Sequence, residues 1–534
     1  MSVRRPRAPA RLIAGPIVGH TDDTSTRVWI QALGDPADYA LRVAGRGVFP
    51  FVSTEGPERE FGTAIAVADG LRPEHRYSYN VLRRGRVVQG GHGTVRTMPR
   101  PGSMADVLFV TISCSDWKED GAWLELEQFV REQQPRFILM IGDQVYLDAG
   151  NTAEKIWPTH LDTPPAKRRQ IMAERYREHW TRAPVRRVMA NTPTYMLWSD
   201  HEIRDGWGSW ASDSPTLQAK YPKGAAIAAR YNAFFEDARK LYWHFQMCHN
   251  FTAPIAEPYA PGVRLTIPVQ FTCGRLAVLM LDDRGDRDLW RETNGALGDA
   301  QWNFLDNEFL PALPRDVDAL VIATQGPIVG PSPTGEAIRR FGHREDDVAL
   351  FSRGDARGLL ALQAKSDSNL EKAEALVDRV VFHDFLPNND VQIKQFDDLR
   401  DQWSHPRCQA EQERLLRRAG NAQLVNRDGG QPRAVMFVGG DLHSGALYEI
   451  SVADSPATVT CLISSGIAQA SGHIVGVKLD DDHRVADGIR ASLKHVVGDF
   501  NFGVTHVLFN GGTPVVNNTL GHPGTSVVKA FKVL

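Results

Sequence analysis

Phe137-Ile138-Leu139-Met140-Ile141-Gly142-Asp143-Gln144-Val145-Tyr146-Leu147-Asp148 is the stretch that decides the fold class of this chain. Its first five residues are apolar without interruption, which predicts a strand buried on both faces. Gly142 has no Cβ and permits a sharp bend, and Asp143, Tyr146 and Asp148 follow at once. In an open α/β sheet, functional groups lie beyond the carboxyl ends of the strands. Carboxylate and phenolate oxygens there suit a hard, highly charged metal ion, although a surface turn after a core strand is equally compatible with this stretch alone.

The bulk composition indicates a soluble globular protein of more than one domain. The chain has 534 residues, of which 42% are hydrophobic and 23% charged, and this length predicts two or three domains. The net charge of −3 argues against a nucleic-acid-binding protein, which usually carries a basic face. The five cysteines are an odd number and contain no Cys-x-x-Cys pair, so we expect neither a disulfide framework nor a zinc ribbon.

The first residues carry a basic, proline-containing segment. Its arginines are Arg4, Arg5, Arg7 and Arg11, and only three apolar residues follow before Gly15, so a twin-arginine export signal lacks its hydrophobic region. No apolar run reaches the length of a membrane span. We therefore expect a cytoplasmic protein with no membrane segment, in which residues 1–11 form a mobile basic arm.

Residues 12–100 have the pattern of a small β-sandwich domain. The segments 25–30, 40–43 and 77–82 alternate between apolar and polar residues, as half-buried strands do. Gly- and Pro-rich turns separate them, and the passage 71–77 is similar to a turn found in fibronectin-type sandwiches. We expect a fibronectin-like domain without a catalytic cluster, followed by a linker.

From Asp106 the pattern changes to α/β, and we expect residues 105–534 to form the catalytic domain. Apolar runs that predict buried strands occupy 107–110, 137–141, 194–198, 276–281, 319–323, 434–438 and 459–463. Helical patterns lie at 122–132, 225–242 and 300–309. A long insertion of loop and helix at 328–375 is a natural candidate for a lid.

Four of these strands end in clusters of potential metal ligands. The clusters are Cys114 with Asp116, Asp143 with Tyr146, Asp200 and His201 with Asp205, and Asp441 with His443. One sheet that carried all four would bring them together on a single rim. A single Asp-x-His is weak evidence, but four clusters directly after buried strands agree with one another. We therefore predict a metal site.

The order and wording of these clusters resemble the PhoD-like alkaline phosphatases of the calcineurin-type metallophosphoesterase superfamily, and the resemblance extends over essentially the whole chain. The motifs that carry it are Gly15-Pro16 with Thr26-Arg27-Val28-Trp29, Ser113-Cys114, Gly142-Asp143 with Tyr146, Asp200-His201-Glu202, Leu281-Asp282 with Arg284, Leu297-Gly298 with Gln301-Trp302, Asp401-Gln402-Trp403, and Gly440-Asp441 with His443-Ser444. The resemblance implies an N-terminal β-sandwich followed by a four-layer α/β/β/α metallophosphoesterase domain.

The resemblance also implies a set of ligands. Asp143 would bridge two metals, and Cys114, Tyr146 and His443 would bind the iron-type site. Asp441 would lie on the side of the second metal, with a ligand from the segment that contains Asp200 and Asp205. Family precedent suggests Fe³⁺ beside Ca²⁺. Family members often end the 200–205 segment in Asn, whereas this chain has Asp205, which would make the second site more anionic.

Two further residues are candidates for catalysis. His201 would protonate the leaving oxygen or steady the phosphate, and Arg284 would neutralise charge on the equatorial phosphoryl oxygens. Each has a plainer alternative. His201 is also compatible with a histidine oriented by a neighbouring carboxylate, and Arg284 with an ion pair to Asp282 or Asp286.

These features predict a metal-dependent phosphoesterase that hydrolyses phosphomonoesters, phosphodiesters or both by a metal-activated hydroxide. Its partner would be a small phosphate-ester substrate, with no nucleic acid and no membrane. Two alternatives stay open at this point. One is a degenerate phosphatase scaffold that acts as a binding protein, and the other is a nucleotidase or pyrophosphatase on the same fold.

Overall fold

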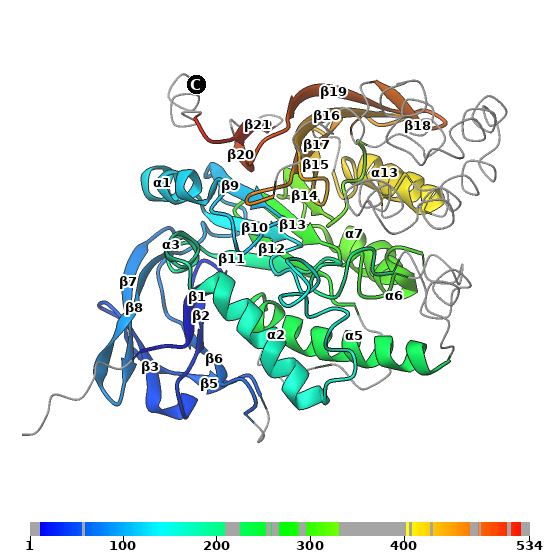
Figure 1. The fold of residues 1–534 in the computed structure, drawn as a ribbon. Helices are drawn as coiled ribbons and strands as arrows, with labels where there is room; N and C mark the ends of the chain where they lie inside the picture. The colour runs from blue at the N-terminus through cyan, green and yellow to red at the C-terminus, as the bar shows by residue number, and fades with distance from the viewer. Residues whose placement is uncertain are drawn as a thin grey trace, which may run out of the picture.

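The computed structural model describes residues 11–55, 59–208, 225–251, 258, 266–287, 295–330, 402–404, 408–427, 431–469, 479, 482–509 and 514–524 (Figure 1). Several predicted features lie wholly or mostly outside these residues. They are the basic arm at 1–11, apart from Arg11, and the insertion at 328–375, apart from its first three residues.

Two four-stranded antiparallel sheets form the N-terminal part of the chain. The first has the order β1 (Ala14–Thr21), β2 (Thr26–Gln31), β6 (Thr63–Ala68) and β5 (Val52–Ser53). The second has the order β4 (Gly47–Pro50), β3 (Tyr39–Val43), β7 (Arg76–Arg83) and β8 (Arg86–Arg96). Side chains from both sheets, among them Val28, Leu41 and Val81, form one buried cluster.

Strand β2 corrects one prediction. Its alternating sequence indicated a strand with one exposed face, but every residue of β2 is buried. The second face is covered because Trp29 packs edge to face against Trp180 of helix α2 (Pro165–Trp180), and its indole nitrogen donates to the carbonyl of His244 at 2.9 Å. The polar side chain of Arg27 is accommodated by a hydrogen bond to the carbonyl of Cys248 at 3.4 Å. Burial of polar groups is tolerated where they find such partners.

Two larger sheets follow. The five-stranded sheet has the order β11-β10-β9-β20-β21, with bounds β9 (Val107–Ile112), β10 (Phe137–Ile141), β11 (Thr194–Leu197), β20 (Phe502–Leu508) and β21 (Val515–Gly521). The eight-stranded sheet has the order β12-β13-β14-β15-β17-β16-β19-β18, with bounds β12 (Val269–Cys273), β13 (Leu276–Met280), β14 (Ala319–Ala323), β15 (Ala434–Gly439), β16 (Gly445–Val452), β17 (Val459–Ser464), β18 (His483–Ala486) and β19 (Ile489–Val497).

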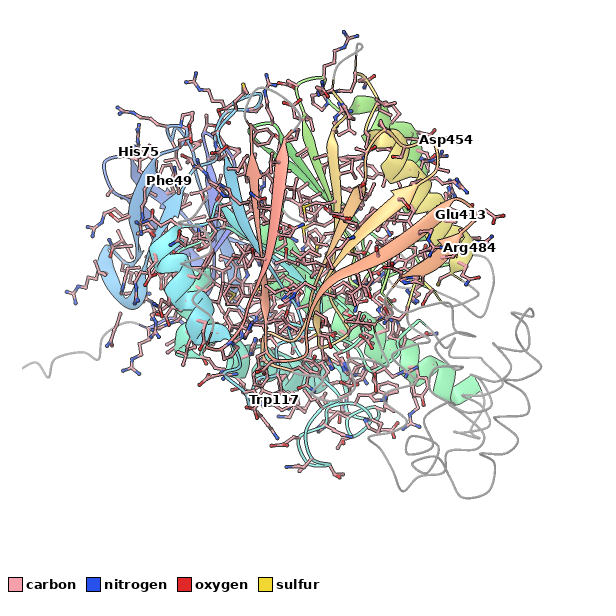
Figure 2. All side chains as sticks on the ribbon, turned by 90° about the horizontal axis from the view of Figure 1, so that it is seen from above. Phe49, His75, Trp117, Glu413, Asp454 and Arg484 are labelled. Atoms are coloured by element: carbon pink, nitrogen blue, oxygen red, sulfur yellow. The ribbon has the colours of Figure 1, made fainter. Side chains whose placement is uncertain are left out.

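One sheet that carried all four clusters is not what the structure has: the predicted strands divide between two sheets, the number that an α/β/β/α arrangement contains. Strands β9, β10 and β11 are parallel in one, and β13, β14, β15 and β17 are parallel in the other. Figure 2 shows both sheets from above, with the N-terminal sheets marked by His75 and Phe49 at one side. A buried strand has the same apolar sequence in either sheet, so periodicity cannot assign it to one of them.

Alternate residues of the larger sheet enter different cores. Val278 and Met280 of β13 belong to the cluster that also contains Phe109 and Ile138 of the five-stranded sheet. Leu279 belongs to the cluster with Leu415 and other side chains of α13 (Gln409–Ala422). Side chains on a strand point alternately to opposite faces, so both faces of this sheet are covered. This double burial explains the uninterrupted apolar runs.

Among the described residues, the other α-helices are α1 (Trp123–Gln133), α3 (Ala183–Met189), α5 (Ala225–Phe245), α6 (Gly298–Asn303) and α7 (Leu310–Ala312). The helix predicted at 300–309 is helical throughout, but its second half, Phe304–Phe309, is a π-helix. All five cysteines are buried. Within the described ranges, none of the helices is both long and apolar enough to cross a bilayer.

His20 of β1 generates a prediction about acid stability. Burial lowers the pKa of His20 from 6.5 to about 4, although the charge of Asp22 opposes the shift. Between these pH values the unfolded chain binds a proton that the folded chain does not, so stability falls as pH falls through this window. We expect His20→Gln to remove on the order of 3 kcal/mol of the loss in unfolding free energy between pH 6.5 and pH 4. Urea denaturation at several pH values measures this, and His92→Gln, at an exposed position, is the control. Equal pH dependence in both variants would contradict the prediction.

Candidate metal centre

The loops after four strands meet at the carboxyl ends of the two large sheets. Ligand atoms of Cys114, Asp143 and His443 all lie within 4.8 Å of one another, and so do those of Asp143, Asp200 and His201. Asp143 belongs to both groups. Its carboxylate therefore occupies the position that one residue shared by two metal ions would need.

The backbone is unusual at these positions. Cys114, Asp143, Asp441 and His443 have φ values of +56°, +56°, +70° and +54°. Positive φ is uncommon for residues other than glycine and costs about 1–3 kcal/mol at each such position. Such strain concentrates at functional sites. Here the left-handed backbone conformation sets the direction of these four side chains, which differs from the direction they would have in a strand or a helix.

Gly142 supplies the bend between β10 and Asp143. Its φ is +96°, and a Cβ at this position would lie 2.6 Å from the Cγ of Gln325 and 2.7 Å from the Cβ of Ser199. Both neighbours follow strands that end at the same rim. A side chain larger than hydrogen would therefore force apart the loops that form the site.

The first group combines a thiol, a phenol and an imidazole. The Cys114 thiol lies 3.3 Å from Asp143 Oδ2 and 3.1 Å from Ser465 Oγ. The hydroxyl of Tyr146 lies 3.5 Å from His443 Nε2. The backbone N–H of His443 donates to Ser465 Oγ at 2.7 Å, so Ser465 ties the Cys114 loop to the His443 loop.

The second group is organised around His201. Its Nδ1 pairs with Asp148 Oδ1 at 2.8 Å, and Asp148 Oδ2 accepts the backbone N–H of Asp205 at 2.5 Å. The carboxylate of Asp200 accepts the Ser199 hydroxyl and the backbone N–H of Gly206, each at 2.7 Å. The plainer alternative for His201, a histidine oriented by a carboxylate, is thus present in the geometry. Asp148 therefore supports the site by orienting His201 and the loop at Asp205.

Arg284 contacts the carboxylates of the site and is fully buried. Its guanidinium lies 3.5 Å from Asp441 Oδ1 and 3.7 Å from Asp200 Oδ1, and its Nε donates to Gln325 Oε1 at 2.9 Å. Asp282, one of the alternative partners, accepts the indole N–H of Trp198 at 2.9 Å and the backbone N–H of Arg284 at 3.0 Å. Gln325 and Gln402 each donate an amide N–H to Asp441.

The electrostatics of the site are those of crowded buried anions. Burial, then the charges of Asp143 and Asp441, raises the pKa of the Cys114 thiol. Burial, then the charge of Asp200, raises the pKa of Asp143. Burial, then the charges of Cys114 and Asp143, raises the pKa of Tyr146. A cation at this position would stabilise all three deprotonated forms.

This donor set fits metal ions. Thiolate, phenolate, imidazole and carboxylate are all metal-ligand groups, and oxygen-rich sets suit hard cations. Seven residues were predicted as ligands. Cys114, Asp143, Asp200 and His443 fall in the two groups, and Tyr146 lies against His443. Asp205 and Asp441 lie outside the two groups, with Asp205 Oδ1 3.9 Å from His201 Nε2. Asp116 caps its own loop by accepting the backbone N–H of Lys118 at 2.8 Å.

Sequence reasoning missed Glu202, which holds two loops together. Its carboxylate accepts the backbone N–H groups of Asp143, Gln144 and Ser199 at 3.1, 2.7 and 2.9 Å. Burial raises the pKa of Glu202 to about 7, although these hydrogen bonds favour its ionised form. Its position after β11, within the Asp-His-Glu motif, was the available signal. Gln325 was also missed, although it follows strand β14.

The fold and the site define a mixed α/β protein with a candidate metal centre where the ends of two sheets meet. Comparison with known proteins narrows this class. The PhoD-like phosphatase model matches residues 109–312, which confirms the resemblance noted in the sequence. The solved "Structure of PhoD" shares the fold, with a TM-score of 0.59 and 15% identity over 97% of this chain and 92% of that chain.

A purple acid phosphatase, PPD1 from yellow lupin (Lupinus luteus), is more distant. It aligns with a TM-score of 0.43 and 11% identity over 96% of this chain and 74% of that chain. No curated protein sequence matches the chain. The match to the phosphatase family model supports a phosphoesterase.

Glu202→Gln tests how the site is held. The amide would turn an N–H toward at least one of the three backbone donors, and we expect a loss of about 3 kcal/mol in unfolding free energy together with a lower metal content. Urea denaturation and elemental analysis measure the two effects. Glu174→Gln is the matched control, because the Glu174 side chain is 60% exposed, and it should change stability by less than about 0.5 kcal/mol. Unchanged stability in Glu202→Gln would show that Glu202 does not hold the loops.

Proposed function

We propose that this chain is a metal-dependent phosphoesterase, similar to alkaline phosphatase D, that hydrolyses phosphomonoesters, phosphodiesters or both. The observation that carries the proposal is the carboxylate of Asp143, which is common to two groups of potential ligands. Two-metal hydrolases use such a shared carboxylate to hold their ions close together. A scaffold without metal has no physical reason to bury so many anionic groups together.

Each ion would have its own set of ligands. Cys114, Tyr146 and His443 would hold one ion with Asp143, and we propose Fe³⁺ there. Asp200, Asp205 and Asp441 would supply ligands to the second ion with Asp143, and we propose Ca²⁺. When bound, the ions would supply Lewis acidity, which activates a water molecule as nucleophile and neutralises phosphate charge.

His201 and Arg284 would act on the substrate. With Nδ1 paired to Asp148, the ring of His201 is held in one orientation, and its Nε2 would hold the proton that the leaving oxygen needs. Arg284 would contribute positive charge close to the phosphoryl oxygens. Because it also faces Asp200 and Asp441, it would keep the two carboxylates in position as well.

The domain organisation belongs to the same proposal. Residues 12–100 would form a fibronectin-like β-sandwich, and residues 105–534 would form a four-layer α/β/β/α catalytic domain. The two N-terminal sheets with their common core and the covered faces of the eight-stranded sheet support these assignments.

Asp143→Asn tests the shared ligand. The neutral amide would be a poor bridge, so we expect loss of both ions and a fall in turnover of at least about a hundredfold, in the range reported for loss of a principal catalytic interaction. Elemental analysis and hydrolysis of an aryl phosphate measure these effects. Asp69→Asn, at an exposed position, should keep metal and activity. Retained turnover in Asp143→Asn would refute the bridging role.

Tyr146→Phe tests the iron-type site. A phenolate bound to ferric iron absorbs visible light, so we expect a coloured wild-type protein and a bleached variant. Absorption spectroscopy on the metal-loaded proteins measures this. Tyr77→Phe is the control, because Tyr77 is a buried tyrosine of β7 and should keep the colour. A colourless wild type that ignores aryl phosphates after loading with iron and calcium would favour a binding scaffold.

A further inference from the structure

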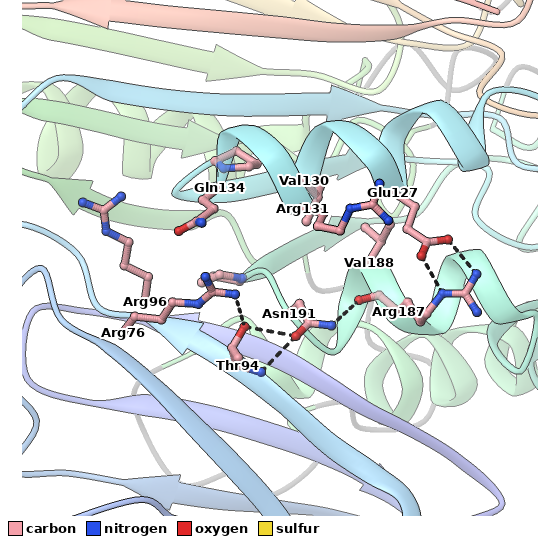
Figure 3. Close-up of a pocket in the computed structure, with 12 residues that line it drawn as sticks. Arg76, Thr94, Arg96, Glu127, Val130, Arg131, Gln134, Arg187, Val188 and Asn191 are labelled. Atoms are coloured by element: carbon pink, nitrogen blue, oxygen red, sulfur yellow. Dashed lines mark hydrogen bonds and ion pairs between the residues drawn. The ribbon is translucent and has the colours of Figure 1, made fainter. Parts of the chain in front are cut away.

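A polar cavity, separate from the candidate metal centre, lies between the N-terminal sheet of β7 and β8 and helices α1 and α3. Its volume is about 230 Å³, and its lining includes Arg76 and Arg96 of the N-terminal sheet, Arg131 and Gln134 near the end of α1, and Arg187 of α3. Figure 3 shows these side chains around the cavity. A cavity of this size suits a small ligand rather than a large organic molecule.

The lining carries an excess of positive charge. Four arginines face one glutamate, Glu127, although the whole chain has a net charge of −3. Glu127 binds Arg187 through two hydrogen bonds of 2.6 and 2.7 Å, so this pair neutralises itself. Arg131 lies 4.0 Å from Glu132 at a largely exposed position, so this pair is weak, and the charges of Arg76 and Arg96 remain without an acidic partner in the lining. The carboxyl end of α1 contributes only about half an elementary negative charge, so the cavity stays strongly positive.

Arg76 and Arg96 are placed against each other by the strand register. They are direct cross-strand partners in the pairing of β7 with β8. Like charges at directly opposite positions destabilise a sheet. The pair therefore costs stability, and folding alone does not explain it.

Arg96 lacks a partner that would compensate this cost. Within the described part of the chain, its side chain has no hydrogen bond or ion pair, and it is half-buried. The nearest acidic group, Glu74, is occupied by Arg136, whose Nη2 donates to Glu74 Oε1 at 2.6 Å. Arg136 also keeps a buried Nη1 without a partner. Burial, then the charge of Arg136, lowers the pKa of Arg96, as expected for a cation in need of an anion.

The cavity is remote from the candidate metal centre. Gln134, Pro135 and Pro193 line it, and these residues precede β10 and β11. Asp143 and Asp200 follow the same two strands. The two sites therefore lie at opposite ends of β10, roughly 17 Å apart at about 3.3 Å per residue.

We propose that this cavity is a second anion site, which binds inorganic phosphate or the phosphate group of a small molecule through Arg76, Arg96 and Arg131. Guanidinium groups match phosphate oxygens in charge and in the geometry of their N–H groups. The side-chain amide of Gln134 offers a further donor. A bound phosphate would also link the N-terminal sheet to α1, and the folded state would gain stability by mass action.

Calorimetric titration with inorganic phosphate tests the proposal. The Asp143→Asn variant serves as background, because it suppresses binding at the candidate metal centre. We expect this variant to bind phosphate at one site, and Asp143→Asn with Arg96→Gln to bind it about tenfold or more weakly, the effect of one lost charge-assisted contact. Arg42→Gln in the same background removes a charge from β3, at an exposed residue outside the cavity, and should leave the affinity within about twofold, because no contact is lost.

Further variants test whether the charge alone is needed and replace any variant that does not fold. Arg96→Lys retains the charge and should restore part of the affinity. If Arg96→Gln does not fold, Arg76→Gln takes its place. If Asp143→Asn does not fold, the titration uses the wild-type protein, which should show two phosphate sites. Only one of these sites should then weaken when Arg96 or Arg76 is replaced by glutamine. Equal affinities in the Arg96→Gln and Arg42→Gln proteins, or no binding without the metal centre, would overturn the proposal.

Discussion

The packing of the two large sheets against one core is the constraint on which the rest of the structure depends. Val278 and Met280 of one sheet and Phe109 and Ile138 of the other lie in the same cluster. Because the parallel strands of both sheets end at one rim, loops from residues 114 to 443 meet there. A slip of one residue in β10 would turn its core-facing side chains to the other face and would move Asp143 away from both groups of ligands. The core therefore sets the position of the site.

The site is arranged at a cost in stability. Four residues have left-handed backbone conformations, and several acidic groups are buried close together. Strain of this kind persists only where the surroundings hold it in place, and here Glu202, Asp148 and Ser465 do so through hydrogen bonds to neighbouring loops. Positive charge comes from Arg284 within the chain. Metal ions would supply the remainder, which explains why an acidic cluster of this density is compatible with a stable fold.

The N-terminal sheet that contains β1, β2 and β6 is part of the same core rather than an appendage. Trp29 and Ile17 belong to the cluster that contains β10, and the indole of Trp29 is bonded to the carbonyl of His244. The cavity lined by Arg76 and Arg96 lies at a different contact, between the sheet of β7 and β8 and helices α1 and α3. The N-terminal part of the chain therefore makes a tight apolar contact through one sheet and forms a positively charged cavity with the other. The apolar contact fixes the N-terminal sheets in place, whereas the cavity retains charge that the protein itself does not compensate.

The sequence by itself determined the strands and indicated several residues that the structure brings together. Apolar runs such as 137–141 place a residue in a buried strand whatever its neighbours are, and the groups that follow each run have to lie at a strand end. This reasoning found Cys114, Asp143, Asp200 and His443, which the structure brings together. Only the tertiary structure decided which strand belongs to which sheet, that β2 is covered on both faces, and that Glu202 and Gln325 hold the loops. The physical reason is that local periodicity reports how deeply a residue is buried, whereas the partner that buries it lies far away along the chain.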